Sequence, residues 1–289
     1  MNYTIGIDLG GTNTRIGLVA EDGKVIEVLK FKTYEHKELN DFVETLSDNI
    51  VLIVQKHNLP KESIKVGIGA PNGNYYAGTI EQAPNLPFKG IVPLVDLLKE
   101  SLKKKSYSAE VVLTNDANAA AMGEKIYGKA KNVRDFVMIT LGTGVGSGIF
   151  VDNKLVYGKS GFAGEAGHAI VQPEGRACGC GRHGCLETYC SATGIVRTAK
   201  ELLHNESTPS CLRAIKEDMI TAKDISDAAD KNDTLALKCF DITARYLALG
   251  LANVAVITSP EKIFISGGLS KAGEKLFKPL KVYFEQFLY

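Results

Sequence analysis

One histidine followed by three closely spaced cysteines constrains this chain more than any other part of its sequence. His168 precedes Cys178, Cys180 and Cys185 within a segment that runs from Gly164 to Glu187. An imidazole and three thiolates form a typical tetrahedral ligand set for Zn²⁺. Because protein would fill all four positions, the spacing predicts a closed, structural zinc site, whereas a catalytic zinc keeps one position open for water. The alternative is a group of stray or buried thiols.

Two carboxylates, Glu165 and Glu187, stand at either end of this segment. A histidine that binds zinc normally donates its second ring N–H to an oxygen outside the metal, and here a substrate could supply that oxygen. The segment therefore predicts that zinc orients His168 and the two carboxylates into one polar pocket. Such a pocket suits a ligand dense in hydroxyl groups, such as a sugar. The alternative is that both are surface carboxylates.

Length, charge and cysteine usage limit the class of protein. The 289 residues suffice for two domains with large cores. The net charge is +1 and no basic run is longer than Lys103 to Lys105, so we expect neither nucleic acid nor an anionic membrane as a partner. The sequence opens directly on a predicted strand, and its longest apolar run, near Leu247 to Ile257, is too short to span a bilayer. We therefore expect a cytoplasmic protein with reduced cysteines.

Predicted strands alternate with predicted helices along the chain, which implies an α/β fold. A loop rich in Asn, Gly and Pro is expected from Pro71 to about Gly90. The predicted strands are Tyr3–Asp8, Thr14–Ala20, Lys24–Thr33, Ile64–Ala70, Glu110–Thr114, Asp135–Leu141, Ser147–Asp152, Leu155–Tyr157 and Lys262–Ser266. The predicted helices span about 38–57, Pro93–Lys104, a segment starting at Asn115, 191–204, 222–231, 233–257 and Lys271–Leu288.

A short internal repeat suggests that the chain has two related halves. Ile7–Gly11 aligns with Ile139–Thr143, and each segment begins a glycine-rich hairpin. We expect two α/β domains with a cleft between them. The N-terminal domain would contain residues 1–116, and the C-terminal domain, residues 117–289, would carry the zinc segment.

Three glycine-rich turns follow predicted strands, namely Gly10-Gly11-Thr12, Gly142-Thr143-Gly144 and Gly267-Gly268. Because glycine has no Cβ, the backbone N–H groups of such turns can point at a phosphate. The alternative is that each turn is only a tight connection. The spacing matches neither a Walker loop nor the dinucleotide-binding fingerprint.

Five segments together resemble the ROK family: Asp8–Thr12, Asn115–Asn118, Leu141–Gly146, Glu165–His168 and the run C-x-C-G-x-x-G-C-x-E that ends at Glu187. They cover nearly the whole chain in the family's order, and the cysteine-rich run is the most specific. The family comprises sugar kinases and related repressors with an actin-like (ribonuclease H-like) two-domain ATPase fold, and bacterial glucokinases are the members that this chain resembles most. The resemblance implies an ATP-dependent hexose kinase that phosphorylates glucose at O6.

The resemblance also implies roles for the matching residues. Asp116 would be the general base for the attacking sugar hydroxyl, although its position fits helix capping, together with Asn118, equally well. The sugar would contact Asn115, Asp116, Glu165, His168, Glu187 and Gly73, and zinc would bind His168, Cys178, Cys180 and Cys185. The ATP phosphates would lie against Gly10, Gly11, Thr12, Thr143 and Gly144, Mg²⁺ near Asp8, and adenosine near Gly267 and Gly268.

Several alternatives stay open on the sequence alone. The sugar could be N-acetylmannosamine, N-acetylglucosamine, mannose, fructose or allose, and the donor could be polyphosphate or ADP. A non-catalytic sugar-sensing repressor would carry a helix-turn-helix ahead of the first strand, and an actin- or chaperone-type ATPase would not need the zinc segment. Family members are commonly dimers, so we expect a homodimer. The sequence departs from many members at Pro71-Asn72-Gly73, and no further strand and helix follow its last predicted helix.

Overall fold

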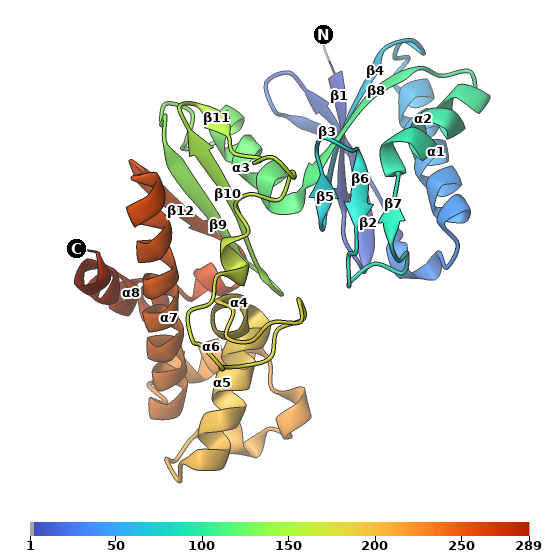
Figure 1. The fold of residues 1–289 in the computed structure, drawn as a ribbon. Coiled ribbons are helices and arrows are strands. Elements are labelled where there is room, and N and C mark those ends of the chain that lie inside the picture. Colours follow the sequence, from blue (N-terminus) through green and yellow to red (C-terminus); the bar gives the residue numbers. More distant parts are fainter. Residues whose placement is uncertain (1–2, 289) are drawn as a thin grey trace. The chain divides into compact units, whose positions relative to one another are not determined.

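The protein consists of two compact α/β units, each with its own hydrophobic core. The fold is that of a computed structural model, and the structure describes residues 3–288 (Figure 1). The first unit holds the chain up to residue 132 together with residues 155–163, and the second holds residues 133–154 and the chain from residue 164 onward. The α/β class expected from the sequence is confirmed.

A five-stranded mixed sheet organises the first unit. Its elements are β1 (Tyr3–Leu9), β2 (Asn13–Ala20), β3 (Val25–Lys32), α1 (Leu39–Lys56), β4 (Ile64–Ala70), α2 (Leu94–Lys104), β8 (Ala109–Asn115) and α3 (Asp116–Tyr127). The strand order is β3-β2-β1-β4-β8, with β1 to β3 antiparallel and β1, β4 and β8 parallel. Helices α1 and α2 pack together and bury Phe42, Ile50 and Leu94 in the first core. The helical periodicity predicted α1 to within one residue at each end.

A small antiparallel sheet begins in the segment for which the sequence predicts only a loop, Pro71 to about Gly90, and its last strand follows that segment directly. Its strands are β5 (Gly73–Asn74), β6 (Thr79–Glu81) and β7 (Ile91–Val92), in that order. Strands of two or three residues are too short to show an alternation of apolar and polar side chains. The sequence pattern therefore could not reveal them.

The second unit is built on a four-stranded sheet and a group of helices. Its elements are β9 (Phe136–Leu141), β10 (Val145–Val151), β11 (Lys154–Leu155), α4 (Glu187–Cys190), α5 (Ala192–Asn205), α6 (Ala222–Asp230), α7 (Thr234–Thr258), β12 (Lys262–Ser266) and α8 (Glu274–Phe287). The strand order is β11-β10-β9-β12, and Leu155, the last residue of β11, already counts with the first unit. Short 3₁₀ helices complete the two units: η1 (Thr33–Glu35), η2 (Ala166–His168), η3 (Cys211–Ala214), η4 (Glu217–Met219) and η5 (Leu269–Ala272).

The longest apolar segment of the chain is longer than the sequence analysis expected, because it extends over the whole of helix α7. It has 25 residues and is long and apolar enough to cross a membrane, so the run near Leu247 to Ile257 is only part of a longer apolar helix. Half of its most apolar window is buried, and Phe240 and Leu247 lie in the second core, where α7 packs against α5 and α8. This burial is typical of a core helix.

The two sheets repeat one arrangement of strands. In the first sheet, β1 pairs antiparallel with β2 and parallel with β4. In the second sheet, β9 pairs antiparallel with β10 and parallel with β12. The aligned segments Ile7–Gly11 and Ile139–Thr143 therefore sit at the same place, the end of the first strand of a hairpin. This topology supports the two related halves suggested by the sequence.

The boundary between the units differs from the predicted division after Asp116. Helix α3 packs against β4 and β8 and so belongs to the first unit. The chain returns to that unit at residues 155–163, where the ring of Tyr157 stacks on that of Tyr75 with centroids 4.3 Å apart. A boundary taken from the order of motifs falls too early, because side-chain packing decides which segments belong together.

Candidate metal centre and active-site residues

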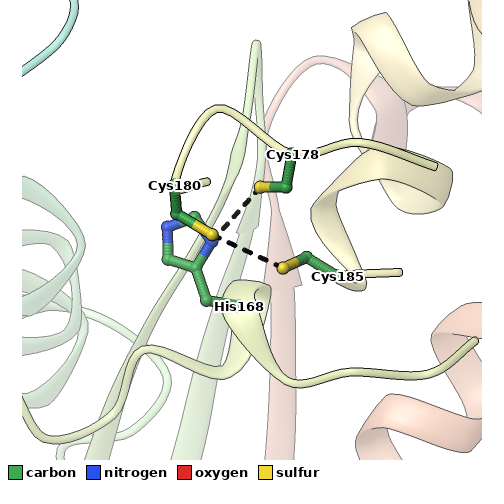
Figure 2. A group of neighbouring side chains, drawn as sticks. All are labelled: His168, Cys178, Cys180 and Cys185. Carbon is green, nitrogen blue, oxygen red and sulfur yellow. Dashed lines mark hydrogen bonds between the residues drawn. The ribbon is translucent and has the colours of Figure 1, made fainter. Parts of the chain in front are cut away.

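The side chains of His168, Cys178, Cys180 and Cys185 gather into one cluster in the second unit (Figure 2). Their ligand atoms all lie within 4.8 Å of one another. Cys178 Sγ is 3.7 Å from His168 Nδ1, and Cys180 Sγ is 3.6 Å from Cys185 Sγ. A tetrahedral zinc with Zn–S bonds of about 2.3 Å holds its sulfur ligands about 3.8 Å apart. The observed separations therefore fit such an ion.

Backbone contacts fold the cysteine-rich loop, the segment between η2 and α4, onto itself. An isolated β-bridge joins Ile170 to Cys185, and the N–H of Cys178 donates to the carbonyl of Arg182 at 2.9 Å. The N–H of Gly181, whose φ is +84°, closes the tip by donating to the carbonyl of Cys178. This turn brings cysteines from both arms of the loop to the same side, close to the end of η2, which carries His168.

Arg176 anchors the cysteine-rich loop two residues before Cys178, and sequence reasoning missed it. Its side chain is only 8% exposed. The guanidinium donates to Glu201 at 2.9 Å, to the carbonyl of Thr188 at 2.8 Å and to the hydroxyl of Thr198 at 2.9 Å, and it lies 4.4 Å from the centroid of the Tyr189 ring. These contacts tie the loop to α4 and α5 without help from a metal. No local pattern marks this arginine, because its partners follow it by 12 or more positions.

The three thiols of the cluster differ in how readily they ionise. Burial raises the pKa of Cys185 to about 12 and also raises the pKa of Cys178. Burial opposes ionisation of Cys180 as well, but hydrogen bonds from Arg182 and from the neighbouring thiols outweigh it and lower the pKa of Cys180 to about 6. Three thiolates in one place need a cation to stabilise them. The donor set therefore suits a divalent metal.

Glu187 connects the cysteine cluster with the glycine-rich turn that follows β9. Its Oε2 accepts a hydrogen bond from the N–H of Val145 at 3.0 Å, and its Oε1 lies 3.9 Å from Cys178 Sγ. A Cβ added to Gly144 would lie 2.2 Å from Oε2, so the carboxylate sits directly against the turn. The sequence placed Glu187 near the metal, but it did not indicate this bond to the turn.

The turn after β9 also receives support from α5 and from the end of β12. The N–H of Ala192 donates to the carbonyl of Gly142 at 2.8 Å, and the hydroxyl of Thr193 donates to the backbone carbonyl of Thr143 at 3.0 Å. A Cβ on Gly267 would lie 2.3 Å from the carbonyl oxygen of Leu141.

The remaining candidates of the second unit lie at η2. The carbonyl of Glu165 accepts a hydrogen bond from the N–H of His168 at 3.0 Å. The second unit thus contains Thr143, Gly144, Glu165, His168, Glu187, Gly267 and Gly268.

The corresponding turn of the first unit, Gly10–Thr12, is closed by its own strands and by a loop. The N–H of Gly10 donates to the carbonyl at the start of β2 at 3.0 Å. A Cβ on Gly11 would lie 2.2 Å from the carbonyl oxygen of Asn85, so the turn packs tightly against that residue. Asp8 lies on β1 just before the turn, with its carboxylate 3.7 Å from the guanidinium of Arg15.

Asp116 opens helix α3 and has the properties of a proton acceptor. The N–H of Ala117 donates to Oδ1 of both Asn115 and Asp116 at 2.8 Å. Burial raises the pKa of Asp116; the hydrogen bond from Ala117 opposes the shift, and the negative charge of Asp8 adds to it. The capping side chains are therefore Asn115 and Asp116. Asn118, the other capping candidate, instead buries Oδ1 without a hydrogen-bond partner among the described residues.

Contacts within the first unit bring the remaining candidates close to α3. A Cβ on Gly73 would lie 2.5 Å from the carbonyl oxygen of Thr114, so Gly73 packs against the end of β8. Asp8 pairs in register with Gly69 of β4, and a Cβ on Gly69 would lie 3.6 Å from Cα of Asp116. The first unit thus contains Asp8, Gly10, Gly11, Thr12, Gly73, Asn115 and Asp116.

Comparison with known proteins assigns the fold and these motifs to one family. Residues 4–289 match the ROK family, and the chain belongs to it. It is similar to the glucokinase of Halalkalibacterium halodurans, with 38% identity over 99% of this chain and 86% of that protein. It is also similar to the xylose repressor of Caldicellulosiruptor bescii, with 33% identity over 98% of this chain and 70% of the repressor.

A solved structure shares both the family and the fold. It is a ROK family glucokinase from Streptomyces griseus in complex with glucose and AMPPNP. The identity is 34%, the TM-score is 0.77, and the match covers 99% of this chain and 90% of that one. The resemblance to bacterial glucokinases drawn from the sequence is therefore confirmed.

Proposed function

We propose that this protein transfers the terminal phosphoryl group of ATP to O6 of glucose, with Asp116 as the general base. The observation that carries the proposal is the buried carboxyl of Asp116, with its raised pKa, on the same unit as Gly73 and Asn115. Such a carboxyl is suited to accept the proton of an attacking hydroxyl, a contribution typically worth about 10²–10⁴-fold in rate.

The enzyme class is an ATP-dependent sugar kinase of the glucokinase type. The glucokinase relative is covered over 86% of its length, compared with 70% of the xylose repressor, and its identity to this chain is higher. A sugar-sensing protein without catalysis is the second candidate, because a repressor belongs to the same family. The raised pKa of Asp116 favours the kinase, since a sensor does not need a proton acceptor.

The glycine-rich turns and the residues beside them supply the phosphate side of the reaction. Transfer of a phosphoryl group depends mainly on positioning and on neutralising charge. Backbone N–H groups of the turns Gly10–Thr12 and Gly142–Gly144, with the hydroxyls of Thr12 and Thr143, would bind the ATP phosphates. Asp8 would hold Mg²⁺, which neutralises phosphate charge when bound, and Gly267 and Gly268 would lie near the adenosine.

The cysteine cluster is proposed to hold a structural Zn²⁺ through His168, Cys178, Cys180 and Cys185. The separations of the ligand atoms and the mixed histidine and cysteine donor set support this assignment. When bound, the ion fixes the loop that carries His168. The second ring nitrogen of His168, together with Glu165 and the end of Glu187 that faces away from Val145, would then bind sugar hydroxyls.

A coupled assay of ADP release across a panel of sugars tests the proposal. Glucose should give the highest kcat/KM, ahead of N-acetylmannosamine, N-acetylglucosamine, mannose, fructose and allose. ATP should be the better donor when compared with ADP and polyphosphate. A faster reaction with another sugar would replace glucose as the substrate and leave the kinase class intact. ADP release that no sugar stimulates would contradict the kinase itself.

We also propose that the protein is a cytoplasmic homodimer. The proposal rests on the family resemblance and on cysteines that are all free among the described residues, as expected in a reducing compartment. Light scattering on the purified protein, at concentrations near those in the assay, would give the mass of the species in solution. A mass of one chain would exclude the dimer.

A further inference from the structure

Ser147, on β10, is only 5% exposed and belongs to none of the proposed binding sites. Its hydroxyl donates a hydrogen bond to the carbonyl of Gly164 and accepts one from the N–H of Ala166 at 3.0 Å. These two backbone groups stand on either side of Glu165 in the chain. One buried hydroxyl therefore holds the backbone of Glu165 from both sides.

The segment around Glu165 forms a sharp and compact turn. Gly164 has a φ of +89°, a value that favours glycine. The N–H of Ala166 also donates to the carbonyl of Gly164 at 2.8 Å, which closes the turn on itself. Bonds within the turn do not fix its orientation, so contacts from outside must do so. Ser147 supplies two of these contacts.

The start of β10 also supports the other proposed sugar-binding residues. The N–H of Val145 donates to Glu187 at 3.0 Å. A Cβ on Gly167 would lie 2.0 Å from the carbonyl oxygen of Val145, so η2, which ends at His168, packs directly on this strand. Since β10 pairs with β9 from its first residue onward, it is a firm support for all of these segments.

The contact with the turn requires a short side chain that both donates and accepts hydrogen bonds. A hydroxyl has one donor hydrogen and two acceptor lone pairs, so Ser147 can bond the carbonyl of Gly164 and the N–H of Ala166 together. Alanine at this position could do neither. The bond between Ala166 and Gly164 would remain, so loss of the hydroxyl would loosen the turn from β10 without opening the turn itself.

We propose that Ser147 is a positioning residue for sugar binding, which fixes the direction in which Glu165 presents its carboxylate. The inference rests on the proposed function, which assigns Glu165 to a sugar hydroxyl, and deepens it by adding β10 to the support of the sugar site. Hydrogen bonds weaken steeply as their geometry departs from linearity. A loosened Glu165 should therefore bind glucose more weakly, while the binding of ATP should change little.

Removing the hydroxyl tests the assignment. Ser147→Ala should raise the dissociation constant for glucose about tenfold, as measured by calorimetric titration, while kcat and the KM for ATP change less than about twofold. Ser147→Cys keeps the shape of the side chain but has a weaker hydrogen-bonding group, so it should raise the dissociation constant by a smaller factor. Unchanged glucose affinity in these variants would overturn the proposal.

Ser47→Ala is the matched control. Ser47, on α1, is also buried and also makes two hydrogen bonds, to the carbonyl of Glu44 at 2.9 Å and with the hydroxyl of Ser101 at 2.8 Å. Each alanine variant loses one buried hydroxyl, so both should unfold at somewhat lower temperatures. Only Ser147→Ala should lose affinity for glucose. An equal loss in both variants would point to general destabilisation and contradict the positioning role.

A double-mutant cycle shows whether Ser147 acts through Glu165. Glu165→Ala alone should weaken glucose binding. Adding Ser147→Ala to it should change the dissociation constant less than about twofold, because no carboxylate is left to position. Losses that multiply in the double variant would show that Ser147 acts elsewhere. Zinc content should be the same in all variants, and loss of zinc from Ser147→Ala would assign the effect to the cysteine cluster instead.

The calorimetric titration keeps this inference separate from the proposed kinase activity. Glucose that binds with the expected difference between variants but is not phosphorylated would support the positioning role and refute the kinase. An enzyme that phosphorylates glucose and whose Ser147→Ala variant binds it as tightly as the unaltered protein would refute the positioning role alone. If the panel of sugars identifies another substrate, that sugar replaces glucose in the titration.

Discussion

The two glycine-rich hairpins occupy the same place in the two sheets, yet their surroundings differ. In the first unit, Gly11 packs so closely on Asn85 that a Cβ would lie 2.2 Å from the carbonyl oxygen. The residue aligned with Gly11 in the second unit is Thr143, which lines a cavity of about 390 Å³. A neighbouring loop therefore closes the first turn, whereas the second turn borders a cavity.

The groups attached to the two turns also differ. The first turn follows Asp8, whose negative charge acts on Asp116 in the same unit. The second turn is bonded to Glu187, which in turn approaches Cys178 of the cysteine cluster. The repeated strands supply equal scaffolds because strand pairing depends on backbone hydrogen bonds. The chemical role of each turn depends on the side chains that surround it.

The largest expected effect comes from Asp116, the proposed proton acceptor, which lies in the first unit. Asp116→Asn should lower kcat about 10²–10⁴-fold, because asparagine cannot accept the proton of the sugar hydroxyl. The fold should be retained, since Asn115 and an asparagine at position 116 can both cap α3. Steady-state kinetics, with thermal unfolding as the control, would measure this. A variant within about threefold of the unaltered enzyme would remove Asp116 from the mechanism.

Replacing one proposed metal ligand tests whether the cysteine cluster stabilises only the second unit. Cys185→Ser should abolish stoichiometric zinc binding and raise the KM for glucose at least about tenfold, because the loop carrying His168 loses its fixed geometry. Cys211→Ser is the matched control, since Cys211 is an exposed free cysteine outside the cluster.

Hydrogen exchange would locate the effect of that metal loss. Peptides around Val145 should exchange faster in Cys185→Ser, whereas peptides around Gly10–Thr12 should not change, because only the turn after β9 is bonded to Glu187. Zinc content equal to that of Cys211→Ser would rule out the proposed ligand set.

A pair of alanine substitutions compares the packing of the two turns directly. Gly11→Ala should lower the free energy of unfolding by about 1–3 kcal/mol, because its Cβ meets the backbone of Asn85, which cannot move aside easily. Gly142→Ala should cost less than about 1 kcal/mol, since the nearest atom to its Cβ would be 4.0 Å away. Denaturant unfolding of both variants tests the difference, and equal losses would show that the two turns are packed alike.

The smallest expected effect concerns the dependence of stability on pH. The pKa of Asp116 is raised in the folded state. At pH values between the unfolded and the folded pKa, the carboxyl of Asp116 therefore keeps its proton in the folded protein and loses it in the unfolded chain. The contribution of Asp116 to stability therefore declines as the pH rises above its unfolded pKa. Asp116→Asn should lack this decline, so its stability relative to the unaltered protein should increase slightly from acidic to neutral pH. Parallel stability curves would contradict the raised pKa.

The sequence predicted those helices and strands whose formation depends on residues that are neighbours along the chain. Helical periodicity located α1, and the ends of β4 and β12 agree with the predicted strands. The cysteine spacing identified four side chains that the fold brings within 4.8 Å of one another. Very short strands such as β5 were missed, because two residues carry no periodicity.

By itself, the sequence determined the α/β class, the paired glycine-rich hairpins and the members of the histidine and cysteine cluster, because each depends on residue type and spacing over a short stretch. Only the tertiary structure decided that residues 155–163 return to the first unit, that Arg176 anchors the cysteine-rich loop and that Glu187 binds the turn at Val145. These contacts join segments far apart along the chain, as Val145 and Glu187 are 42 residues apart. Their formation depends on the path of the whole backbone, which local spacing does not encode.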